Sequence, residues 1–116
     1  MQAADLLAQR CAPQTEALGA DRLDACLAAV ENWREEGGRI VRQFHFKNYY
    51  RTLAFVNAVA WIAHTEDHHP EMTVTYNNCT VRYDTHSVNG GRGGLSINDF
   101  ICAAKIDALF ASAAAD

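Results

Sequence analysis

The stretch MTVTYNNCTVRYDT, residues 72–85, determines the fold that we expect for this chain. Its two halves, 72–76 and 80–85, are rich in Val, Thr and Tyr, which favour β-strands. Between them, Asn77 and Asn78 suit the left-handed backbone of a tight hairpin turn. We therefore predict two antiparallel strands joined by a two-residue turn.

A second pair of extended segments precedes this hairpin. Gly37 and Gly38 interrupt the chain, and short extended segments, 32–35 and 39–46, lie on either side of them. Apolar and polar residues alternate along 39–46, with Arg42 as the main exception, and this period of two is typical of a half-buried strand. The two hairpins together predict a four-stranded antiparallel sheet.

Helical patterns separate and flank the two hairpins. Asp21 is a good N-cap for a first helix, and Asn48 can cap a second that extends to about Thr65. Residues 96–99, Ser-Ile-Asn-Asp, form a capping box that opens a third. The order α-β-β-α-β-β-α predicts an α+β domain with three helices packed on one face of the sheet. The other face is then open for a ligand or a partner.

The 116 residues fit one domain. Residues 1–19 contain Pro13 and Gly19, and we expect them to form a loosely held N-terminal arm, with the domain itself over residues 20–116. A chain this small buries a limited fraction of its surface, so self-association is expected.

Composition excludes several classes of function. The formal net charge is −4 and the basic residues are scattered, which argues against nucleic-acid binding. No segment reaches the roughly 20 apolar residues of a membrane span, and residues 1–10 do not have the pattern of a secretory signal. The four cysteines form no CxxC pair, so we expect free thiols in a reducing cytoplasm.

Histidines mark the candidate site. Residues 64–70, His-Thr-Glu-Asp-His-His-Pro, hold three of the five histidines and lie where Pro70 forces the second helix to end. Strand alternation places His86 with Asp84, on the face opposite Val81, Tyr83 and Thr85. Histidine suits proton transfer because its ordinary pKa of about 6.5 lies near neutrality. We expect the fifth histidine, His45, to be structural or solvent-exposed and to have no role in the site.

A metal site is the competing chemistry for this cluster. His64 and His68 are four residues apart on one helix face, His86 would add a third ligand, and Asp67 or Glu66 would complete the site. Zinc hydrolases with an HExxH motif have Glu directly after the first His, but here that position is Thr65, in His64-Thr65-Glu66-Asp67-His68. This argues against zinc hydrolase chemistry. Acid–base catalysis by histidine is therefore the favoured interpretation.

The pattern as a whole resembles the pterin-4a-carbinolamine dehydratase family over roughly residues 20 to 110. The residues that carry the resemblance are Asp67-His68-His69-Pro70, Tyr76, Val81, Thr85-His86, Gly93-Gly94-Leu95-Ser96, Asp99 and Ala103, with Trp33, Phe44-x-Phe46, Ala54-Phe55-Val56 and Ala58-Val59-Ala60 upstream.

The resemblance implies an enzyme that dehydrates 4a-hydroxytetrahydropterin to quinonoid dihydropterin without a metal or organic cofactor. It implies a homodimer or homotetramer that serves an aromatic amino-acid hydroxylase by recycling its pterin. Carried over by position, His68, His69 and His86 are the catalytic residues. Four further residues are implied in substrate binding: His64, Asp67, Asp84 and Thr85.

Two departures from the family pattern leave alternatives open. His64 stands where many members have Glu, and the loop between His86 and Asp99 is longer than usual, with extra residues at 89–93. A different pterin is one alternative, including a role in pterin-type molybdenum cofactor metabolism. The other is a pterin-binding or protein-interaction module of the same fold without dehydratase activity.

Overall fold

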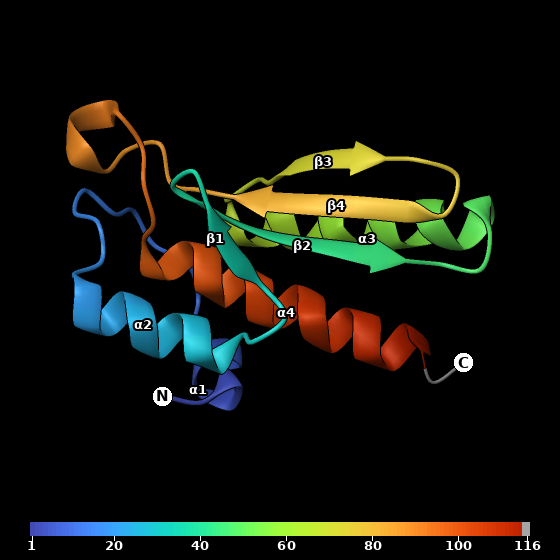
Figure 1. Cartoon of the computed structure of the whole chain (residues 1–116), viewed down its shortest axis with the longest axis horizontal. Helices are drawn as coiled ribbons and strands as arrows, with labels where there is room; N and C mark the ends of the chain where they lie inside the picture. The colour runs from blue at the N-terminus through green and yellow to red at the C-terminus, as the bar shows by residue number, and fades with distance from the viewer. Residues whose placement is uncertain (115–116) are drawn as a thin grey trace.

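The computed structural model describes residues 1–114, so the last two residues of the predicted domain, 115 and 116, lie outside it. Four strands form one antiparallel sheet in the order β1-β2-β4-β3 (Figure 1). The strands are β1 (Arg34–Glu36), β2 (Arg39–His45), β3 (Glu71–Val74) and β4 (Asn78–Tyr83). The predicted α+β class and antiparallel sheet are confirmed.

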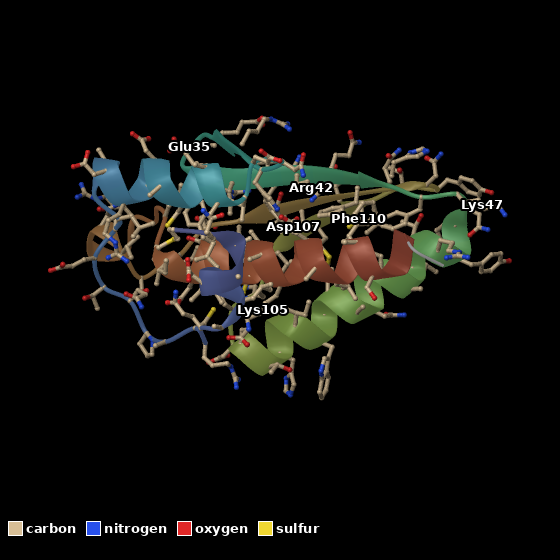
Figure 2. The ribbon with its side chains drawn as sticks, turned by 90° about the horizontal axis from the view of Figure 1, so that it is seen from below. Glu35, Arg42, Lys47, Lys105, Asp107 and Phe110 are labelled. Carbon is tan, nitrogen blue, oxygen red and sulfur yellow. The ribbon has the colours of Figure 1, made fainter. Side chains whose placement is uncertain are left out.

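Helices cover one face of the sheet. Figure 2 shows α4 lying across the middle of this face, with α2 and α3 on either side and the sheet behind them. The α-helices are α1 (Ala3–Leu7), α2 (Ala20–Ala29), α3 (Tyr49–Glu66) and α4 (Ile97–Ala114), and a short 3₁₀ turn, η1 (Asn89–Gly91), precedes α4. No helix within residues 1–114 is both long and apolar enough to cross a membrane.

Local sequence explains where the long helices begin. The side chain of Asn48 accepts a hydrogen bond from the Arg51 amide at 2.9 Å, as an N-cap should. At the start of α4, the Ser96 amide donates to the Asp99 carboxylate at 2.9 Å, and the Ser96 hydroxyl accepts from the Asn98 amide at 3.2 Å. Ser96 and Asp99 therefore cap the helix as predicted, with Asn98 in place of Asp99 as the donor to the hydroxyl. The start of α2 differs from the prediction, because Gly19 and not Asp21 is its N-cap.

The core lies between the sheet and the helices. Phe44 is buried on β2, and its ring contacts those of Trp33, Phe55 and Phe110. Arg42, the exception in the strand pattern, also faces the helices: its guanidinium lies 4.4 Å from the centre of the Phe44 ring. It pairs with Asp107 of α4 at 2.7 Å (Figure 2). The polar residue in an apolar strand face is therefore paired across the two layers.

The predicted two-residue turn in the second hairpin is wrong. Val74 pairs with Cys79 and Asn78 already belongs to β4, so residues 75–77 connect the two strands, and the Thr75 amide donates a hydrogen bond to the Asn78 carbonyl. Apart from glycines, the residues of 1–114 with positive φ are Asp67 and Asn89. Neither Asn77 nor Asn78 therefore has the left-handed backbone that was expected. Asn78 instead pairs with His45 of β2, so it is part of the sheet and not of the turn.

The N-terminal arm is held more closely than expected. Leu6 of α1 is fully buried, and α1 packs against α4. The Lys105 ammonium donates to the Leu7 carbonyl, and the Leu18 amide donates to the Leu95 carbonyl. Residues 1–19 therefore add to the core, because Leu6 belongs to the buried cluster and Cys11 and Leu18 pack against it.

Candidate active site

The end of α3 fixes the direction of the two adjacent histidines. The helix ends at Glu66, and Asp67 takes the left-handed conformation (φ 53°, ψ 44°), which stops it three residues before Pro70. The amides of Asp67 and His68 still donate to carbonyls of the last turn. His68 and His69 therefore leave the helix in a fixed direction, toward the end of β4.

His68 is held on two sides. Its Nε2 donates to Asp99 Oδ1 at 2.6 Å, and its ring stacks on Tyr83 with centroids 5.0 Å apart. The Tyr83 hydroxyl in turn donates to the backbone carbonyl of His68 at 3.0 Å. The side chain of His68 is only 13% exposed. This histidine is anchored, with little freedom to turn.

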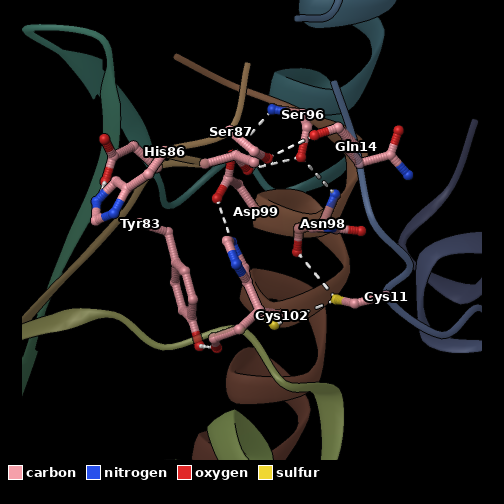
Figure 3. A network of polar contacts seen from close by, with 12 residues as sticks. Cys11, Gln14, Tyr83, His86, Ser87, Ser96, Asn98, Asp99 and Cys102 are labelled. Atoms are coloured by element: carbon pink, nitrogen blue, oxygen red, sulfur yellow. Dashed lines mark hydrogen bonds and ion pairs between the residues drawn. The ribbon is translucent and has the colours of Figure 1, made fainter. Parts of the chain in front are cut away.

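Asp99 is the centre of the polar network in Figure 3. It is fully buried at the start of α4 and accepts hydrogen bonds from His68, from the Thr85 hydroxyl at 2.9 Å and from the Ser96 amide. The hydroxyls of Thr85 and Ser96 are 2.7 Å apart. One carboxylate therefore ties the His-His segment, the end of β4 and the start of α4 together.

This network changes the pKa of His68. Burial alone would lower that pKa, because it disfavours the charged imidazolium. The hydrogen bond to Asp99 and the negative charge of Asp99 outweigh burial, and the pKa of His68 is raised above its ordinary value. His68 is therefore stabilised in its protonated form.

The other two site histidines, His69 and His86, face each other from different segments. The predicted alternation along β4 is confirmed: Tyr83 and Thr85 are buried, while His86 is 75% exposed beside Asp84. His86 Nε2 lies 3.4 Å from Asp84 Oδ1. The rings of His69 and His86 are 6.2 Å apart and nearly perpendicular. Two accessible histidines therefore lie beside one anchored histidine.

These residues line one pocket with a volume of about 380 Å³. That volume is within the range of about 300–1,000 Å³ that small-molecule sites have. The lining residues are Cys11, Ala12, Pro13, Gln14, Glu66, Asp67, His68, His69, Asp84, Thr85, His86, Ser87 and Asn98. Six of the seven predicted site residues are thus brought together.

His64 is the predicted site residue that the structure leaves out of this pocket. It lies on the exposed side of α3, with its ring 5.7 Å from the ring of Trp61. The rival zinc arrangement of His64, His68 and His86 is not found, and no group of three or more His, Cys, Asp or Glu within residues 1–114 is placed to share a metal ion. The long loop at 89–94 does not line the pocket either.

Sequence reasoning missed one whole side of the pocket. Cys11, Ala12, Pro13 and Gln14, which we call the N-terminal wall, come from the arm that was expected to be loose. Asn98 holds the Ala12 backbone at both its amide (3.2 Å) and its carbonyl (2.8 Å). Glu66 accepts from the Cys11 amide at 2.8 Å. These contacts join residues over 50 positions apart, so no local pattern could show them.

The family model described as "Pterin 4 alpha carbinolamine dehydratase" matches residues 16–109, which include all three site histidines. The chain belongs to this family. A protein of Bdellovibrio bacteriovorus named "Putative pterin-4-alpha-carbinolamine dehydratase" is 53% identical over 109 residues, covering 94% of this chain and 91% of that protein. One of the same name from Nitrosospira multiformis is 51% identical, covering 91% and 93%.

Solved structures of pterin dehydratases have the same fold. A transcriptional coactivator/pterin dehydratase from Brucella melitensis superposes with a TM-score of 0.73 at 29% identity, over 81% of this chain and 98% of that one. A pterin dehydratase-like protein described as a RuBisCO assembly factor of the alpha-carboxysome gives 0.58 at 26% identity, over 68% and 89%. Proteins with this fold are therefore described as a coactivator/pterin dehydratase in one case and as an assembly factor in the other.

Proposed function

We propose that this member of the family is an active 4a-hydroxytetrahydropterin dehydratase that works by histidine acid–base catalysis. The observation that carries the proposal is the pocket in which anchored His68 lies beside the accessible pair His69 and His86. Membership of the family supplies the substrate class.

The reaction needs two proton transfers on one small molecule. The C4a hydroxyl is a poor leaving group as hydroxide, so a general acid protonates it and it leaves as water while the N5 lone pair forms the C4a=N5 bond. A general base then removes the N5 proton to give the quinonoid dihydropterin. Histidine can serve in both steps near neutral pH.

The geometry supports a division of labour among the three histidines. His69 and His86 are exposed, come from two segments, and have ring centroids 6.2 Å apart, which suits an acid and a base acting on neighbouring substrate atoms. His68 is tied to Asp99 and stacked on Tyr83, so it orients substrate or shares the proton relay. Asp67, Asp84 and Thr85 are proposed to line the bound pterin.

The test is the dehydration rate of 4a-hydroxytetrahydropterin, generated in place by a hydroxylase and followed by absorbance. We expect His69→Ala and His86→Ala each to lower the catalysed rate by about 10²–10⁴-fold, the usual contribution of a positioned acid or base. His64→Ala is the matched control, because this histidine is outside the pocket. Its rate should stay close to that of the unmodified chain.

A second function has one observation in its favour. The RuBisCO assembly factor described above has the same fold, so a pterin-binding or protein-interaction role without dehydration is the alternative. An unmodified chain that binds a pterin but does not accelerate dehydration would favour it. Equal rates for His69→Ala and His64→Ala would also contradict the proposed catalytic site.

The setting that we propose follows from the same activity. A dehydratase of this type recycles the pterin of an aromatic amino-acid hydroxylase in the cytoplasm. The substrate is small, so the pocket within one chain is sufficient to bind it. Assembly into a homodimer or homotetramer would therefore add stability without completing the site.

A further inference from the structure

Two of the four cysteines lie against each other beside the pocket. Cys11 Sγ is 3.7 Å from Cys102 Sγ (Figure 3), although 91 positions separate them in the chain. Both are free thiols, as are Cys26 and Cys79. Among the cysteines of residues 1–114, Cys11 and Cys102 are the pair joined by a sulfur–sulfur contact.

The two thiols differ in their surroundings. Cys102 is fully buried on α4. Cys11 is half-buried, lines the pocket, and belongs to residues 9–19, which form no helix or strand. A small solute that enters the pocket therefore reaches Cys11 directly. The irregular backbone around Cys11 is the part that can move when the two sulfurs close from 3.7 Å to the roughly 2.05 Å of a disulfide.

We propose that Cys11 and Cys102 are a site of reversible oxidation by peroxide, which forms a disulfide that fastens the N-terminal wall of the pocket to α4. The reaction needs neither a pterin nor the dehydration step. Its failure would therefore leave the proposed function untouched, and failure of the proposed function would not affect it.

The chemistry balances with hydrogen peroxide as the oxidant. One thiol, as its thiolate, takes an oxygen atom from the peroxide to become a sulfenic acid, and water is released. The sulfur of the second thiol displaces the sulfenic hydroxyl, which leaves as a second water. Two thiols and one peroxide thus give one disulfide and two waters, and a thiol reductant reverses the change.

The contact between the sulfurs prepares one of them for this reaction. The hydrogen-bonding contact with Cys11 lowers the pKa of Cys102, against the opposite effect of burial, and the Tyr83 hydroxyl lowers it further. The same contact raises the pKa of Cys11, and burial adds to that rise. Cys102 therefore ionises more readily, while Cys11 remains a protonated partner within reach.

Oxidation would change the wall that holds a bound ligand. Cys11 is followed directly by Ala12, Pro13 and Gln14, which line the pocket. In the reduced chain this segment is held by Asn98, by Glu66 and by the Ser87 hydroxyl, which donates to the Gln14 carbonyl. A covalent bond at Cys11 would make that attachment independent of the hydrogen bonds.

The experiment treats the purified full chain with a small molar excess of hydrogen peroxide, blocks the remaining thiols, and maps peptides by mass spectrometry. We expect a loss of two free thiols and a linked pair of peptides containing Cys11 and Cys102. Because the bond closes a long loop, the Tm should rise by roughly 10 °C and return on reduction. The variant carrying Cys26→Ala and Cys79→Ala should behave in the same way.

The Cys11→Ala variant is the matched control, and it should show neither the linked peptides nor the reversible rise in Tm. Recovery of Cys11 and Cys102 as blocked thiols after peroxide treatment would overturn the proposal. So would a disulfide that joins either of them to Cys26 or Cys79. The peptide map of the unmodified chain decides the question even if Cys11→Ala fails to fold.

Discussion

At the scale of single residues, the link between Asp99 and His68 has a consequence that can be measured directly, a raised pKa of His68. Asp99 is buried, and it is the group whose hydrogen bond and charge raise the pKa of His68 against the effect of burial. We predict that Asp99→Asn lowers the pKa of His68, because an amide keeps the shape of the side chain and loses its charge. The pKa is measured by NMR titration of the imidazole protons.

Asp67→Asn is the control for that titration. It also removes one negative charge next to His68 in the sequence, and asparagine tolerates the left-handed backbone at this position. We expect the pKa of His68 to change much less in Asp67→Asn than in Asp99→Asn. Equal shifts in the two variants would show that general charge, and not the 2.6 Å contact, controls His68.

His68 also makes the free energy of unfolding depend on pH. Because the pKa of His68 is raised in the folded chain, its contribution to stability is complete below the unfolded value of about 6.5. The contribution is lost as the pH rises through the folded value. A hydrogen bond to a charged group is worth about 1.5–3 kcal/mol. In urea unfolding, the difference between the unmodified chain and His68→Gln should shrink from pH 6 to pH 9. A difference that grows over this range would contradict the prediction.

Single residues also show what the sequence could and could not reveal about the site. The sequence predicted the pair His68-His69 before a proline and the side of the strand on which His86 lies, because both depend on local patterns. Asp99 was identified as a helix cap, but its bond to a histidine 31 positions away was not visible. Asn98 and Glu66 gave no signal, since each binds backbone groups of the arm. His64 was included by position and lies outside the pocket.

At the scale of elements, local chemistry predicted the helix boundaries better than the turns. Asn48 and the Ser96–Asp99 box satisfy the first amides of α3 and α4, so these helices begin where their caps stand. The hairpin connection at 75–77 depends on how β4 pairs with β2 as well as with β3. That pairing is a tertiary feature, and the residues of the turn do not contain it.

The short helix α1 gives a direct test of how firmly the arm is held. Leu6 is fully buried against α4, whereas its neighbour Leu7 is 39% exposed. We predict that Leu6→Ala lowers the free energy of unfolding by about 2–5 kcal/mol, the usual cost of emptying a buried leucine site. Leu7→Ala should cost well under half as much. Urea denaturation followed by far-UV circular dichroism measures both.

The paired leucines make the outcome unambiguous. They are adjacent on the same helix and differ in burial, so helix propensity affects both in the same way. Equal and small losses for the two variants would mean that the arm is loosely held, as the sequence alone predicted. A selective loss for Leu6→Ala would show that residues 1–19 are part of the folded unit.

At the scale of the whole molecule, the site forms where separate parts of the chain meet at one end of the sheet. The end of α3, the end of β4, the start of α4 and the N-terminal wall each supply lining residues. The wall lies outside the 16–109 range of the family match. The common scaffold therefore positions the histidines, while a segment beyond the match closes one side of the pocket.

The last prediction concerns how complete molecules associate. Trp61 is 69% exposed and Tyr50 is 80% exposed on the outer side of α3, on a domain too small to bury most of its apolar surface. We predict a homodimer or larger assembly in which this side of α3 is covered. Trp61→Glu should weaken association at least tenfold, because burying an unpaired charge is costly. Trp61→Phe, which keeps an apolar ring, should retain assembly. Light scattering over a range of concentrations gives the mass of each variant, and a monomeric mass for the unmodified chain throughout that range would contradict the prediction.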